Sequence, residues 1–159
     1  MTKPSETVEQ RLAALGYTLP APSTPFGVYR AAVRSGELIY VSGQVALRDG
    51  QIVHPGRLGV NVSVEQGQEA ARVAALNALA AASVLAPLDE LRVVRLVGHV
   101  ASAPTFTQQP TVIDGASELL RDALGERRGV GARLAIGVTA LPAESPVELE
   151  LIFEAPTGT

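Results

Sequence analysis

The stretch ARLAIGVTALPAESPVELELIFE, residues 132–154, alternates apolar with small or charged residues on either side of a proline-containing break. This two-residue period predicts two β-strands, around residues 133–140 and 147–153. Arg133 heads the first strand and shares one of its faces with small residues such as Ala135. A guanidinium above such a shallow surface can be solvated at a sheet edge, paired with a carboxylate of its own chain, or left open to receive a planar anion.

Two helices are predicted upstream of this stretch. Ser63 and Gln66 have the spacing of a capping box before a long segment whose apolar side is mostly alanine. Such small residues allow a helix to lie close to a sheet. Pro110 and Gly125 mark the start and the end of the second helix.

Further β-rich segments precede each helix. We expect strands at residues 27–33, 37–47 and 92–102, and Asp49-Gly50 indicates a tight turn. The order of strands, helix, strand, helix and two strands indicates an α+β fold, with a β-sheet and two helices packed on one face of it. The other face of the sheet must then be buried against something other than these two helices.

The N-terminal residues predict a separate arm. Thr7 and Gln10 resemble a capping box, and three prolines in YTLPAPSTPF, residues 17–26, indicate an extended connector. We therefore expect an N-terminal helix and proline-rich connector at residues 1–25 and the main domain at residues 26–155. The first ten residues lack the apolar core of a signal peptide, so the expected location is cytoplasmic.

Composition limits the partners. The formal net charge is −3, and the longest basic cluster is Arg127-Arg128, which argues against nucleic acid. There are no cysteines and two histidines, so no metal site is expected. Arg72 and Asn77 interrupt the most apolar window, which argues against a membrane partner. With 47% hydrophobic and 18% charged residues, the chain is expected to bury part of its surface in a homo-oligomer.

Several motifs together carry a resemblance to a known family. They are GVYRAAV, YVSGQVAL, the pair Ala132-Arg133, the pair Leu141-Pro142 and VELELIFE. From Phe26 to Glu154 the chain resembles the Rid family of reactive intermediate deaminases, also called YjgF or L-PSP, in its longer-chain branch. The resemblance implies a chorismate-mutase-like fold with a mixed β-sheet, a homotrimer with clefts at the subunit interfaces, and hydrolysis of 2-imino or enamine acids to 2-keto acids and ammonia, with no cofactor.

The resemblance also implies site residues. Arg133 would bind the substrate carboxylate, Glu148 would position the attacking water, and Tyr29 would supply an aromatic hydroxyl. The implied substrate-binding positions are Ser42, Gly43, Ala135 and Asp114. Several members have an amide where Asp114 stands, and a carboxylate there would repel an anionic ligand unless it is turned away or protonated.

The chemistry of a 2-imino acid agrees with these roles. Its planar carboxylate suits a bidentate arginine better than a lysine, and it holds the electrophilic carbon beside that anchor. Imines already hydrolyse in water, so positioning together with a carboxylate base could add a gain of ~10²–10⁴-fold.

Each residue also has a structural alternative. Arg133 could pair with Glu148 or Glu150 of a neighbouring subunit, Glu148 could be the solvent side of a strand, and Tyr29 could be a packing residue. For the whole chain, the alternative is a non-enzymatic trimeric protein that binds small molecules or acts as a holdase. RNA cleavage would need a basic track, which the sequence lacks.

Neither histidine is assigned a function. We interpret His54 as a turn residue and His99 as a polar strand position or an interface contact, and no histidine–acid pair is evident.

If the last two strands formed a simple hairpin, Arg133 and Glu148 would lie about 20 Å apart at ~3.3 Å per residue. The family's strand order avoids that hairpin.

Overall fold

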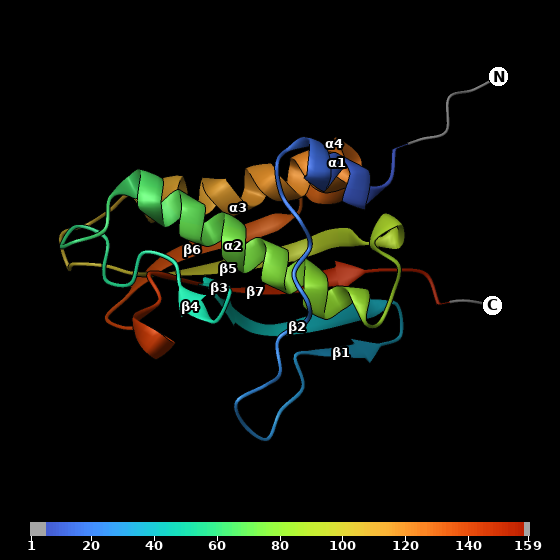
Figure 1. Cartoon of the computed structure of the whole chain (residues 1–159), viewed down its shortest axis with the longest axis horizontal. Helices are drawn as coiled ribbons and strands as arrows, with labels where there is room; N and C mark the ends of the chain where they lie inside the picture. The colour runs from blue at the N-terminus through green and yellow to red at the C-terminus, as the bar shows by residue number, and fades with distance from the viewer. Residues whose placement is uncertain (1–5, 158–159) are drawn as a thin grey trace.

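The computed structural model describes residues 6–157 as a five-stranded sheet with helices on one face (Figure 1). The strand order is β1 (Ala32–Ser35), β2 (Leu38–Val45), β7 (Val147–Glu154), β5 (Arg92–Ala101) and β6 (Ala132–Val138). Strands β5 and β6 are parallel and the other neighbours are antiparallel. The predicted α+β class is confirmed, with a sheet that is mixed.

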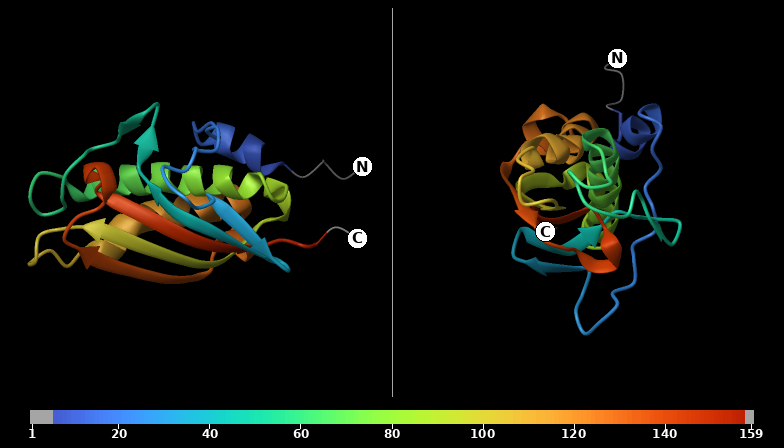
Figure 2. Two further views of the ribbon diagram at one scale, coloured as in Figure 1. Left: turned by 90° about the horizontal axis from the view of Figure 1, so that it is seen from below. Right: turned by 90° about the vertical axis from the view of Figure 1, so that its left-hand side faces the viewer.

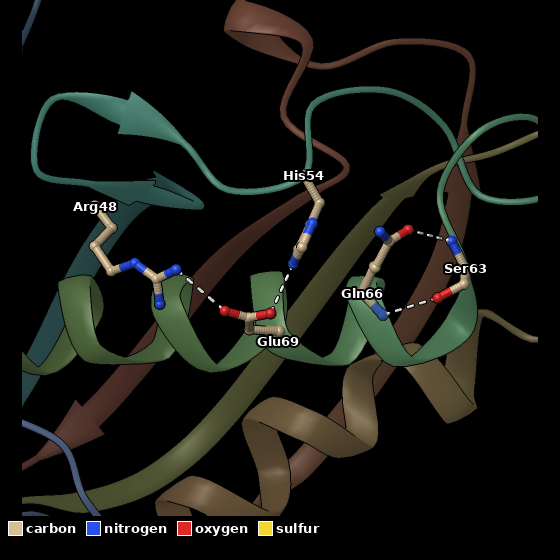
Figure 3. A network of polar contacts seen from close by, with 5 residues as sticks. All are labelled: Arg48, His54, Ser63, Gln66 and Glu69. Carbon is tan, nitrogen blue, oxygen red and sulfur yellow. Dashed lines mark hydrogen bonds and ion pairs between the residues drawn. The ribbon is translucent and has the colours of Figure 1, made fainter.

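Two long helices, α2 (Val64–Ser83) and α3 (Gln109–Leu124), pack along one side of the sheet (Figure 2). The capping box of α2 is present: Ser63 Oγ accepts from the Gln66 N–H at 3.2 Å, and Gln66 Oε1 accepts from the Ser63 N–H at 2.9 Å (Figure 3). The helices meet closely at Gly115, where a Cβ would lie 2.9 Å from the Gln68 Cα. Small residues therefore set the spacing of this layer, as expected.

The N-terminal helix α1 (Val8–Ala14) begins at the predicted capping box of Thr7. Its apolar residues Val8 and Leu12 are buried in the same core as α2, α3 and the sheet. The connector then crosses in front of α2 and swings out past the edge of the sheet before β1 (Figure 1). The first five residues of the predicted arm lie outside the described residues.

The remaining elements are short. They are β3 (Leu47–Arg48), β4 (Gln51–Ile52), α4 (Glu126–Gly129) and the 3₁₀ turns η1 (Leu88–Glu90) and η2 (Pro142–Glu144). The predicted turn between β3 and β4 has φ of 53° at Asp49 and 79° at Gly50, the left-handed pair that a two-residue hairpin loop favours. No helix within residues 6–157 is long and apolar enough to cross a membrane.

The predicted strand at residues 27–33 is wrong for most of its length, because residues 27–31 form bends and β1 begins at Ala32. The partner strand β2 has an irregularity between Val41 and Gln44, where its register with β7 shifts. A regular ladder cannot continue past such a bulge, so the segment before Ala32 is free to turn away.

Alternation along β7 separates the two faces of the sheet. Leu149 and Leu151 are buried under the helices, whereas Glu148 and Glu150 point to the other side. We call this other side the open face, since no helix within residues 6–157 covers it (Figure 2). On this face the central strands β5 and β7 carry Val97, His99, Glu148 and Glu150, and the edge strand β6 carries Leu134 and Ile136. The side under α2 and α3 is the helix face.

Candidate functional site

A pocket of about 370 Å³ lies where β2, β7, the connector and η2 meet. Tyr29, Gly43 and Glu148 all line it, so three of the predicted site residues come together. Tyr29 comes from the bends before β1, Gly43 from the irregular part of β2, and Glu148 from β7. At the rim, Ala143 has a φ of 53°, a left-handed conformation that is uncommon for a residue with a Cβ and often found near functional sites.

Two side chains that the sequence did not single out as functional hold the walls of this pocket. The Asn77 amide of α2 donates to the carbonyls of Val45 at 3.0 Å and Leu47 at 2.9 Å. Ser145 is fully buried; its Oγ accepts from the Ala46 N–H at 3.1 Å and donates to the Val147 carbonyl at 2.7 Å. Asn77 therefore ties the end of β2 to α2, and Ser145 joins it to the start of β7, next to Glu148.

Glu148 is a half-buried carboxyl beside a glycine. Burial raises its pKa above the usual value of 4.5, His99 acts in the opposite direction, and Glu150 adds to the rise. A Cβ at Gly43 would overlap the Glu148 carboxylate, with its Cδ only 3.0 Å away. Gly43 therefore leaves the space that this carboxylate occupies.

We expect Gly43→Ala to lower any turnover in this pocket by about tenfold or more, with little change in melting temperature. The new methyl group displaces the end of a flexible side chain on an exposed segment, so the fold adapts but the carboxylate moves. Turnover and thermal unfolding, measured on the same preparation, test this. A fully active Gly43→Ala protein would show that the position of Glu148 is unimportant.

His99 is the neighbour of Glu148 that the sequence reasoning missed. The two residues are direct partners in the antiparallel pairing of β5 with β7, and both are half-buried on the open face. Cβ atoms of such directly opposed residues lie about 4.5–5.5 Å apart. No such pair is evident in the sequence, because only the pairing of two strands distant in sequence brings His99 and Glu148 together.

Ser42 lies outside the pocket that contains Glu148. Its Oγ donates to the Arg30 carbonyl at 2.7 Å, and its N–H donates to the Ala31 carbonyl at 2.9 Å. It lines a different hollow on the open face, with Arg95 and Glu150. In this structure the serine holds the segment that leads into β1.

Arg133 is on the helix face, not above an open floor. Its Nη1 donates to Asp114 Oδ1 at 2.7 Å and to Ser117 Oγ at 3.2 Å, both on α3. Of the three possibilities for this arginine, the structure shows pairing with a carboxylate of its own chain. Asp114 is turned toward the guanidinium, and Ala135 follows on the same face, partly buried against the core.

Arg133 and Glu148 do not meet within one chain. The last two strands do not form a hairpin, because β5 lies between β6 and β7, as the family's strand order implies. Leu96 of β5 is opposite both Arg133 and Leu151, and Leu151 is buried on the helix face. Residues opposite one another point to the same side, so the sheet itself separates Arg133 from Glu148.

The other histidine forms a second polar cluster, away from this pocket. His54 Nε2 lies 2.6 Å from Glu69 Oε2, and Arg48 Nη2 lies 3.1 Å from Glu69 Oε1 (Figure 3). The hydrogen bond from His54 is the main cause that lowers the pKa of Glu69. His54 has a φ of 53°, which agrees with a turn residue, and the cluster ties this loop to α2. Within residues 6–157, no three histidine or carboxylate side chains are grouped to hold a metal ion.

Two larger hollows lie elsewhere and contain none of the predicted site residues. One, of about 590 Å³, is lined by charged side chains of both signs around α4 and the end of β7. The other, of about 620 Å³, lies between the connector, the β3–β4 turn and α2. Of these three hollows, only the 370 Å³ pocket brings predicted site residues together, so we take it as the candidate site despite its smaller volume.

Comparison with known proteins gives relatives along nearly the whole chain. Residues 9–154 match the family model described as "YjgF/chorismate_mutase-like, putative endoribonuclease". The chain is 40% identical to Protein TCP17 of Trypanosoma cruzi over 152 residues, 94% of this chain and 95% of that protein. It is similar to the crystal structure of Atu1372 from Agrobacterium tumefaciens, whose function is unknown, with 39% identity and a TM-score of 0.87 over 95% of this chain and 93% of that one. A "putative endoribonuclease" from Shewanella oneidensis is 30% identical with a TM-score of 0.88, over 94% and 99% of the two chains.

Proposed function

Because the chain belongs to the YjgF/chorismate-mutase-like family, known also as Rid or L-PSP, we propose that it hydrolyses 2-imino and enamine acids to 2-keto acids and ammonia. The observation that carries the proposal is the pocket lined by Tyr29, Gly43 and Glu148, in which burial raises the pKa of the Glu148 carboxyl. A carboxyl with a raised pKa is suited to accept a proton and to return it at neutral pH.

The reaction needs one proton carrier and no redox partner. A water oxygen bonds to the carbon of the protonated imine while Glu148 takes one water proton, which gives a neutral carbinolamine; Glu148 releases one proton to solvent at the end of the cycle. The hydroxyl proton then moves to the nitrogen through the same carboxyl, the carbon–nitrogen bond breaks, and ammonia leaves behind a carbonyl group. Tyr29, which also lines the pocket, can hydrogen-bond the nitrogen. The family resemblance implies neither a metal nor a cofactor for these steps.

The substrate carboxylate is the ligand that we assign to Arg133. Since the sheet separates Arg133 from Glu148, one substrate can contact both only if they come from different subunits. We therefore place the site at the interface of a homotrimer. Four apolar side chains of the open face are 38–49% exposed and support such an interface: Val33, Tyr40, Leu134 and Ile136.

The proposal is tested with 2-iminopropanoate, formed in the assay by an amino-acid oxidase acting on alanine and captured by semicarbazide. Substoichiometric protein is expected to lower the early rate of capture at least tenfold, because hydrolysis removes the imine first. If capture is unchanged while pyruvate or benzoate still raises the melting temperature, the non-enzymatic binding protein is the better description. Unchanged capture without any carboxylate binding would contradict both functions.

A further inference from the structure

The ion pair between Arg133 and Asp114 restricts which ligands can bind to Arg133. The pair is accessible, with 29% of the arginine side chain and 45% of the aspartate side chain exposed. Asp114 Oδ1 accepts from the guanidinium at 2.7 Å, and Oδ2 makes no hydrogen bond to any group within residues 6–157. A ligand that reaches Arg133 therefore meets a donor fork and a free carboxylate oxygen next to each other.

We propose that Asp114 makes this site selective for zwitterionic 2-imino acids, in which a protonated nitrogen stands beside the carboxylate, and that it disfavours the 2-keto acid product. This inference rests on the proposed function, in which Arg133 holds the substrate carboxylate. It names Asp114 as the residue that distinguishes substrate from product.

The selectivity follows from charge and from hydrogen-bond direction. An arginine alone attracts any carboxylate, but Arg133 and Asp114 together have no net charge, so a simple anion gains less and is repelled by Asp114. A protonated imine has N–H donors next to its carboxylate, and Asp114 Oδ2 can accept from them. In the product an oxygen acceptor replaces that nitrogen, so two acceptors would face each other and the product is released.

Stable analogues separate these two charge types. Alanine and 2-aminobutyrate present an ammonium group beside the carboxylate, whereas pyruvate and 2-oxobutyrate present a carbonyl oxygen. We expect the wild-type protein to bind the amino acids more tightly than the matching keto acids in calorimetric titrations. Asp114→Asn, which keeps the shape and supplies an N–H donor, should shift the ratio of the two Kd values at least tenfold toward the keto acids.

A charge-matched control is available on the same helix. Glu118→Gln removes one negative charge from an exposed position that makes no hydrogen bond or ion pair with Arg133 within residues 6–157, and it should leave the ratio of Kd values unchanged. Tighter binding of keto acids by the wild-type protein, no binding of either class, or an unchanged ratio in Asp114→Asn would each overturn the inference. If the ratio shifts as expected but the wild-type protein hydrolyses no imine, the proposed function fails and the ligand selectivity stands.

Discussion

Glu148→Gln is expected to lower imine hydrolysis about 10²–10⁴-fold, the usual contribution of a general base. The same change should leave the melting temperature at neutral pH unchanged or slightly higher. Burial raises the pKa of Glu148 in the folded state, so its contribution to stability is present below pH 4.5 and is lost as the pH rises through the folded value. At pH 7 the ionised group therefore disfavours folding, and a neutral amide removes this effect.

The pH profile gives a second measure of the same residue. Wild-type activity should fall on the acid side as Glu148 takes up its proton, at a pH above 4.5 because its pKa is raised. The Glu148→Gln protein should lose this acid limb. Glu150→Gln is the matched control, since Glu150 lies two residues along the same face of β7 and is exposed outside the pocket. It should keep the acid limb, moved to lower pH because Glu150 contributes to the raised pKa of Glu148. Equal losses in both variants would show that the charge of the open face matters and that Glu148 is not the base.

Subunit mixing should restore activity from two inactive proteins. Arg133→Gln is expected to lose about 10- to 150-fold, from one charge-assisted hydrogen bond of about 1.5–3 kcal/mol, and Glu148→Gln loses more. In trimers formed at random from equal amounts of both variants, each site takes its arginine from one subunit and its glutamate from another. Each of these is intact half of the time, so about a quarter of the sites should be complete.

The mixing experiment uses co-expressed variants that carry different affinity tags, so that mixed oligomers can be isolated and their mass measured. Each isolated mixed trimer has one complete site in three, so recovery of about a third of wild-type activity supports a site that two subunits share. If Arg133 and Glu148 acted from one subunit, no mixed oligomer would contain an intact site and activity would stay at the level of the variants alone. A monomeric mass for the wild-type protein would contradict the shared site directly.

Local features of the sequence determined where the elements begin and end. The capping box of Ser63 and Gln66, the Asp49-Gly50 turn and Gly125 after α3 all act through backbone groups a few residues away, so their patterns predict structure without knowledge of the fold. The α+β class followed from the order of these elements. The spacing of Arg133 and the residues after it also indicated the family, which the match over residues 9–154 confirms.

The tertiary structure alone decided which of the predicted site residues meet. Strand β5 inserts between β6 and β7, and this places His99 opposite Glu148 and puts Arg133 on the helix face beside Asp114. Alternation in a sequence shows that two residues share a face of one strand, but not which strand lies next to it. That choice depends on burying the apolar sides of β5 and β7 under α2 and α3, contacts between segments that are distant in sequence, and so no local pattern could predict it.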